Sequence, residues 1–326
     1  RKKSEWEKGL RHAKTRENNL LNMYFYKNLM GDHPYSFNHD LDLRLVALER
    51  ITPQSLTEYY NRAILPNHTI LFVYGDFDTD RMEELIKRYF GDWEKKEIKV
   101  KPAKVKENKE IYGRVLIVDK PDATQAKIKM GYPFYDERFL DRNLEERASF
   151  EIANLIFGGG DFESYLMDEI RSEKGYAYDI SADFFNRPLG GAYFITTSVK
   201  PERAFDTVAT IKRIMSDVKT GRKRFSEEEV FKVINQRNAF FPEAFRHRDS
   251  VIRNLIANVE LKKRDPDYLN HYIRIYNRVT AAKTQKAFAK HAFPEKFFTV
   301  IVGKKEALLP QFLEAGIEVK VIEVAN

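Results

Sequence analysis

Apolar and polar positions alternate in short runs through residues 111–326, and longer amphipathic stretches separate these runs. A period of two, rich in β-branched and aromatic residues, indicates strands. The predicted strands are residues 114–120, 125–134, 176–185 and 191–199. Helical spacing instead fits residues 144–157, 162–173, 201–220 and 226–240. Because the strands are grouped rather than alternating regularly with helices, we expect an α+β fold with a mostly antiparallel sheet packed against helices.

Capping residues mark two of the predicted helix starts. Ser226 is followed by Glu229, the spacing of a capping box. Asp76, Asp78 and Asp80 alternate as in a calcium loop, but the glycine and the final glutamate that such a loop needs are replaced by arginine and lysine. We therefore interpret Asp78–Asp80 as helix-capping residues.

An internal repeat relates two distant parts of the chain. Residues 51–75 and 279–303 align without a gap at an offset of 228 (279 − 51 = 228), and Pro66 is paired with Pro294. Each copy is predicted to form a helix, a proline-containing turn, an apolar strand ending in glycine, and a second helix. The shared turn positions favour duplication of one design over a chance match.

The repeat sets the expected domain organisation. The second copy begins near Tyr112, about 167 residues before Val279 (279 − 112 = 167), whereas only 50 residues precede Ile51. We expect residues 1–93 to be the back part of a truncated first domain and residues 111–326 to be a complete second domain. Residues 94–110 are dense in lysine and glutamate and are predicted to form a charged linker.

Composition narrows the possible functions. Hydrophobic residues make up 43% and charged residues 32% of the 326-residue chain, which is typical of a globular protein. The net charge of +7 is spread along the chain and mixed with acidic residues, so it gives little support to nucleic-acid binding. The longest apolar runs are too short to span a membrane. The absence of cysteine excludes a thiol nucleophile.

The strongest local motif is FGGGDFESYLMDEIRSEKGYAYDI, residues 157–180. Its glycine cluster matches neither a dinucleotide-binding nor a P-loop pattern. The sequence GGG…S-x-L…I-R-x-x-K-G-x-x-Y resembles the second-domain signature of pitrilysin/insulinase-like zinc metallopeptidases and of the related mitochondrial processing peptidase subunits. GDHPYSF (residues 31–37) and FVYGDFDTDRMEELIKRYFGDW (residues 72–93) are similar to the back half of that family's first domain.

The resemblance implies a zinc site, but this chain contains only part of the residues that would form it. The family's inverted motif H-x-x-E-H places two histidines and a general base beside Zn2+. None of the 7 histidines here lies in such a motif, so we expect it to belong to a missing N-terminal segment or to another chain. Residues 4–8, SEWEK, resemble the stretch around the third zinc ligand, which makes Glu5 the candidate ligand and Glu7 a weaker one. We do not expect this chain alone to hold Zn2+.

The resemblance also implies an arginine and a tyrosine that face the zinc across the cleft and bind the substrate backbone. Arg171 matches the arginine. Tyr178 fits the G-x-x-Y of the two-domain members, whereas Tyr176 fits the G-Y of the larger members, so both remain candidates. The alternative is that Arg171 is a cation at the C-terminal end of a helix and that the tyrosines belong to the core of the sheet.

Three functions remain open. The favoured one is part of a zinc-dependent metalloendopeptidase that cleaves peptides in an interdomain chamber, with this piece supplying the chamber wall and substrate contacts. The alternative is a non-catalytic subunit or inactive half that acts as a structural partner of such a peptidase. A basic nucleic-acid-binding module is the remote third reading, and no binding motif supports it. The expected partners are a peptide substrate and the missing segment or another peptidase subunit.

Overall fold

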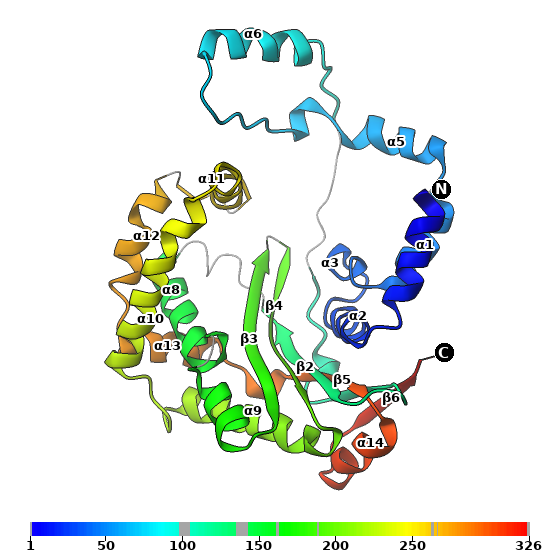
Figure 1. Ribbon diagram of the computed structural model, residues 1–326, viewed down its shortest axis with the longest axis vertical. Helices are drawn as coiled ribbons and strands as arrows, with labels where there is room; N and C mark the ends of the chain where they lie inside the picture. The colour runs from blue at the N-terminus through cyan, green and yellow to red at the C-terminus, as the bar shows by residue number, and fades with distance from the viewer. Residues whose placement is uncertain are drawn as a thin grey trace.

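A six-stranded mixed sheet forms the centre of the molecule (Figure 1). The computed structural model describes residues 2–97, 105–134, 143–160, 163–187, 189–261, 264–265 and 267–324. The strands are β1 (Val115–Asp119), β2 (Ala126–Pro133), β3 (Ala177–Arg187), β4 (Gly190–Val199), β5 (Phe298–Gly303) and β6 (Val319–Glu323). Their order is β3-β4-β2-β5-β1-β6, so β3 is an edge strand. β3, β4, β2 and β5 pair antiparallel, while β1 pairs parallel with both β5 and β6. The predicted α+β class is confirmed.

Helices of the second half cover one face of this sheet. They are α8 (Leu144–Asn154), α9 (Ala204–Thr220), α10 (Glu227–Phe240), α12 (Tyr268–Tyr276), α13 (Ala281–His291) and α14 (Lys305–Glu314). Alternation along the strands sends Ile128, Met130 and Tyr132 of β2 into the core beneath these helices. Ser226 caps α10 with its hydroxyl 3.1 Å from the Glu229 amide, which confirms the predicted capping box.

A helix from the first part of the chain covers the opposite face of the sheet. This helix, α2 (Glu17–Met30), packs against β2 and β5. Gly131 of β2 permits the close approach, because a side chain there would meet the Phe25 ring at 2.9 Å. Val105, in the predicted charged linker, is also buried in this second core and donates its N–H to the Leu189 carbonyl at 2.9 Å. Residues 98–104 of that linker lie outside the described residues.

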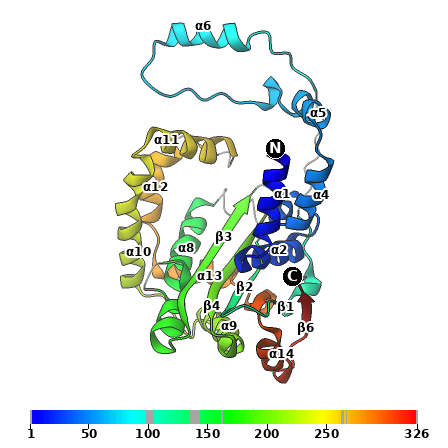
Figure 2. The same cartoon turned by 45° about the vertical axis from the view of Figure 1, so that its right-hand side comes forward.

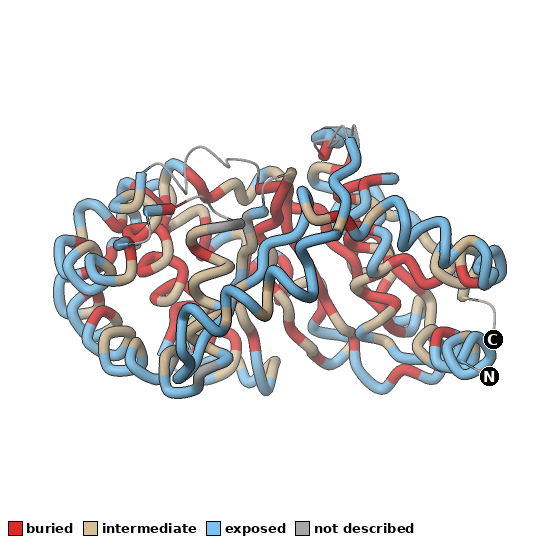
Figure 3. Tube along the Cα trace, turned by 90° about the horizontal axis from the view of Figure 1, so that it is seen from above, coloured by how far each residue is buried: buried red, intermediate tan, exposed pale blue. Residues whose placement is uncertain are grey.

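The first part of the chain, as far as the structure describes it, contains helices and no strands. Besides α2, they are α1 (Lys2–Ala13), α3 (Pro34–Phe37), α4 (Leu41–Arg50), α5 (Pro53–Ala63) and α6 (Thr79–Phe90). α1, α2 and α4 share a small core built from Leu10, Met23, Leu41 and Leu48. α5, α6 and the extended segment between them form an arch away from the sheet, and most of this arch is exposed (Figures 1 and 3).

The two repeat copies have the same order of elements but different surroundings. α5 begins and ends 228 residues before α13, and the short turn η1 (Pro66–His68) lies 228 residues before η8 (Pro294–Lys296). The second copy forms β5 in the middle of the sheet. The corresponding segment 70–75 was predicted to be a strand, but it has no strand assignment. Extended backbone needs a neighbouring strand for its hydrogen bonds, and the described residues provide none there.

Asp78 caps α6, as the interpretation of the aspartate run predicted. Its carboxylate accepts a hydrogen bond from the Arg81 amide at 2.8 Å. In the part of the chain that the structure describes, no helix has the length and apolar character needed to cross a membrane.

Candidate functional site

Arg171 lies in the π-helix η4 (Met167–Glu173), just before β3. This wider helical turn ends at Gly175, whose φ of 63° is in the left-handed region that favours glycine. The Tyr176 amide donates to the Ile170 carbonyl at 2.9 Å and closes the turn. Because π-turns carry an additional residue, they displace side chains relative to an ordinary helix and recur at functional sites.

The structure brings Arg171 and Tyr178 together. The guanidinium carbon of Arg171 lies 5.0 Å from the centre of the Tyr178 ring, within cation–π range. Tyr178 is at the start of the edge strand β3 and is 79% exposed. The pair therefore presents a cation and a phenol to the solvent beside a sheet edge.

Tyr176 has different neighbours. The Arg203 guanidinium lies 5.1 Å and the Lys174 ammonium 5.4 Å from its ring centre. A hydrogen bond with Asp206 raises the pKa of the Tyr176 hydroxyl. The ring also packs against the main core, so its surroundings are those of a structural residue. Of the two tyrosines, Tyr178 is the one whose ring lies beneath Arg171.

Glu5 lies in the first turn of α1, where it forms an ion pair with Lys2 at 3.4 Å and is half exposed. Glu7 is paired with Arg11 at 2.9 Å on the same helix. Among the described residues, no three histidine, cysteine, aspartate or glutamate side chains are grouped closely enough to hold a metal ion. A catalytic zinc site needs three protein ligands. The described residues therefore do not fit a complete zinc site, and Glu5 remains a predicted ligand.

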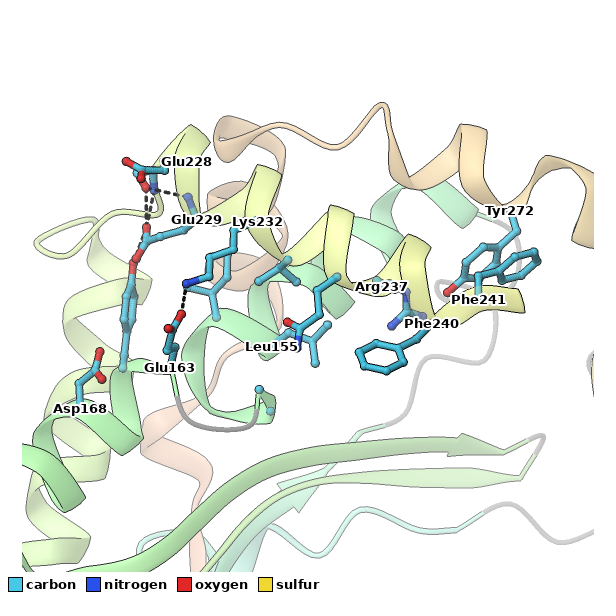
Figure 4. Close-up of a pocket in the computed structure, with 17 residues that line it drawn as sticks. Leu155, Glu163, Asp168, Glu228, Glu229, Lys232, Arg237, Phe240, Phe241 and Tyr272 are labelled. Carbon is cyan, nitrogen blue, oxygen red and sulfur yellow. Dashed lines mark hydrogen bonds and ion pairs between the residues drawn. The ribbon is translucent and has the colours of Figure 1, made fainter. Parts of the chain in front are cut away.

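A separate cavity of about 1090 Å3 lies between α10 and the π-helix η3 (Leu155–Gly159) (Figure 4). One end is lined by Asp168, Glu228, Glu229 and an ion pair between Lys232 and Glu163. The other end is aromatic and contains Phe240, Phe241 and Tyr272. None of Arg171, Tyr176 and Tyr178 lines this cavity, so it is distinct from the predicted substrate contacts.

Comparison with models of known protein families shows to which family the chain belongs. Residues 50–237, more than half of the chain, match the sequence model described as the peptidase M16 inactive domain. The chain belongs to the peptidase M16 family. The matched range includes both Arg171 and Tyr178, and the resemblance noted in the sequence is confirmed.

Relatives of this M16 chain include proteins named as zinc proteases and one named as a probable inactive metalloprotease. An uncharacterized zinc protease of Mycobacterium leprae is 25% identical over 60% of this chain and 42% of its own length. The probable inactive metalloprotease YmfF of Bacillus subtilis is 22% identical over 64% of this chain and 46% of its own length. The chain thus spans less than half of the length of these relatives.

A solved structure shares the fold. The peptidase M16 inactive domain from Pseudomonas fluorescens superposes with a TM-score of 0.78 at 19% identity. The superposition covers 93% of this M16 chain and 69% of the other.

Sequence reasoning missed two buried charged groups of this M16 chain. Glu151 accepts hydrogen bonds from Arg147 and Arg237, both at 2.7 Å, and from Tyr276. Burial raises the pKa of the Glu151 carboxyl, but the two arginines outweigh it and hold the pKa below its usual range. Because this network joins α8, α10 and α12, its role is structural.

The second missed group is Lys129, which is only 5% exposed. Its ammonium donates to Asn22 at 2.8 Å and to the Tyr26 hydroxyl at 3.3 Å. It also lies 4.0 Å from the centre of the Phe194 ring. A lysine inside the apolar run of β2 was the signal available in the sequence. It fixes α2 on the sheet through neutral partners.

Proposed function

We propose that this chain forms the substrate-contacting half of an M16 peptidase, whose metal-binding residues lie outside the residues described. Arg171 and Tyr178 would hold the backbone of a peptide in the chamber between the halves. The observation that carries this proposal is the stacking of the Arg171 guanidinium on the exposed Tyr178 ring, at the end of a π-turn and beside the edge strand β3.

The chemistry of the pair suits a peptide carbonyl. A guanidinium offers several N–H donors in a fixed plane, and hydrogen bonds from charged donors are about twice as strong as neutral ones. The Tyr178 ring lies against the guanidinium, and its hydroxyl adds another donor. In this proposal the contribution of Arg171 and Tyr178 is to bind and orient the peptide.

Peptide binding by the purified chain tests this proposal. An unstructured, fluorescein-labelled peptide is titrated and followed by fluorescence anisotropy. We expect Arg171→Ala to weaken binding about ten- to hundredfold, as for loss of a charged hydrogen bond worth about 1.5–3 kcal/mol. Arg171→Lys should restore only part of the affinity. Tyr176→Phe is the matched control and should bind as the wild type does. Equal affinities of the Ala variant and the wild type would remove Arg171 from the site.

The match to a sequence model described as the peptidase M16 inactive domain supports a second candidate function, that of a non-catalytic partner of an M16 peptidase. The second candidate function predicts a different result in the binding experiment. A purely structural partner would bind the peptide no better with Arg171 than without it, yet would still be needed for activity of the assembled enzyme.

A further inference from the structure

A second cavity lies between α13 and the loop that follows α9. The two helices pack against each other on the helix-covered face of the sheet (Figures 1 and 2). α9 ends at Thr220, and Gly221 turns the chain with a φ of 79°, in the left-handed region that favours glycine. The cavity has a volume of about 490 Å3. Small-molecule sites measure roughly 300–1,000 Å3, so a small ligand would fit here.

Small side chains on α13 leave this space open. Ala282 and Ala289, two helical turns apart, line the cavity. Gln285, between them, fixes the loop to the helix. Its amide nitrogen donates to the Val218 carbonyl, and its amide oxygen accepts the Phe225 N–H at 3.2 Å. The walls of the cavity are therefore held together by hydrogen bonds, and its shape follows from the fold.

The cavity is positively charged. Lys219, Arg224 and Lys286 line it, and none of the lining residues that the structure describes is acidic. Lys219 forms a long ion pair with Glu295, at 3.4 Å. The Nε–H of Arg224 donates to the Gly221 carbonyl at 3.2 Å, but in the part of the chain that the structure describes neither Arg224 nor Lys286 pairs with a carboxylate. Because cations without counter-charges repel one another, an anion between them would be stabilised.

The polar groups of the cavity are mainly donors. An ammonium and a guanidinium have N–H donors and no acceptor. The Gln285 amide is occupied at both ends, and the Thr220 hydroxyl donates to the Ser216 carbonyl at 2.8 Å. Glu227, which does not line the cavity, accepts the Ala281 N–H at 3.1 Å. A peptide would bring N–H donors that find few acceptors here, whereas the oxygens of a phosphate are acceptors.

We propose that this cavity binds inorganic pyrophosphate. Arg224 would bind one phosphoryl group through paired N–H donors, because the guanidinium fork matches the geometry of a phosphate. Lys219 and Lys286 would bind the other group as point charges. Two phosphoryl groups carry about three to four negative charges near pH 7, close to the three positive charges of the lining. Arg171 and Tyr178 do not line the cavity, so the inference does not depend on the proposed function.

The aromatic content of the cavity favours an inorganic anion over a nucleotide. Phe225 is the only aromatic residue among the described lining residues, and it is 5% exposed. Its ring packs against Tyr165 and Phe288, at centre-to-centre distances of 5.8 and 5.7 Å. A base would therefore have no open ring on which to stack.

Isothermal titration calorimetry of the whole chain with sodium pyrophosphate tests the site. Arg224→Ala and Lys286→Ala each remove one cation, and Ala282→Leu fills part of the cavity without changing the charge. Lys320→Ala is the matched control, because Lys320 lies on the edge strand β6, outside the cavity. All four side chains are exposed, so the substitutions should leave the fold intact. Sulfate and adenosine diphosphate, titrated at the same ionic strength, are the comparison ligands.

We expect one pyrophosphate to bind per chain, and each of the three cavity variants to weaken binding about tenfold or more. Lys320→Ala should stay within about twofold of the wild type, and sulfate should bind the wild type about tenfold more weakly than pyrophosphate. Absence of binding to the wild type would overturn the proposal. Equal losses in Lys320→Ala and Arg224→Ala would also overturn it, since attraction to the net charge of +7 would then explain the binding. Sulfate binding as tightly as pyrophosphate would contradict a site for two linked groups, and tighter binding of adenosine diphosphate would contradict an inorganic ligand.

Discussion

The guanidinium of Arg171 stacks on the ring of Tyr178, while Tyr176, two residues earlier, lies beneath Arg203 and Lys174. Side chains two residues apart in a regular strand point to the same side. Here Tyr176 precedes β3, and the pairing of β3 with β4 is irregular between Ala177 and Ile180, around Tyr178. The left-handed Gly175 and the wide π-turn lead directly into this irregular start. The geometry thus separates two candidates that were equivalent in the sequence.

The first prediction concerns Arg171 in an assembled enzyme that contains a zinc-bearing half. If Arg171 donates to the substrate carbonyl as its oxygen becomes negative, Arg171→Ala should lower kcat/KM about 10²–10³-fold, the loss expected for one such donor. Peptide hydrolysis measures this. The melting temperature should change little, because a cation at the end of a helix contributes only about 0.3–1 kcal/mol. A lower melting temperature with unchanged turnover per folded molecule would instead assign Arg171 a structural role.

Zinc binding by the chain alone gives the second prediction. The resemblance supports Glu5 as the predicted ligand and Glu7 as a weaker alternative, and one carboxylate cannot form a catalytic zinc site. Calorimetric titration with Zn2+ should show no stoichiometric binding, and added Zn2+ should produce no EDTA-sensitive cleavage of an unfolded peptide. Robust cleavage that EDTA abolishes would show that ligands exist in arrangements not recognised here.

The sequence predicted much of the secondary structure of the second half. Period-two runs located β1 to β4, and the Ser226–Glu229 spacing fixed the start of α10. It could not give the parallel pairing of β1 with β5 and β6, because pairing depends on crossover connections rather than on local pattern. The segment 70–74 looks like a strand by composition, but strand formation also requires a neighbour.

The candidate site was only partly predictable. The motif located Arg171, yet the choice between the tyrosines depended on a π-turn that has no simple sequence signal. The partners of Lys129 and Glu151 could not be predicted, because Asn22 and Arg237 are distant from them in sequence. Long-range contacts of this kind become visible only in the folded chain.

The third prediction compares the two repeat copies by their matched aromatic residues. Tyr60 of α5 is 62% exposed, whereas its equivalent Phe288 of α13 is fully buried (60 + 228 = 288). Phe288→Ala should cost about 3–5 kcal/mol of unfolding free energy through cavity formation. Tyr60→Ala in this chain should stay within about 0.5 kcal/mol of the wild type. Urea denaturation of both variants checks this, and a large loss for Tyr60→Ala would mean that the arch is packed in solution.

The last prediction concerns the pH dependence of stability at Lys129. Burial lowers the pKa of Lys129 from 10.5 to about 8, although Asp183 opposes the shift. Below about pH 8 both states carry the charge, so folding bears the cost of burying it; between pH 8 and 10.5 the folded state loses the proton first, and stability rises with pH. Lys129→Met removes the charge and should raise the unfolding free energy by about 1–3 kcal/mol at pH 7. That advantage should shrink as the pH approaches 10.

Lys127→Met, on the same strand but more exposed, is the matched control and should show little change with pH. Urea denaturation of the three proteins at pH 7, 8.5 and 10 measures the effect. If the advantage of Lys129→Met stayed constant across this range, the lysine would be charged throughout, and its aromatic and amide neighbours would be sufficient to hold a buried cation.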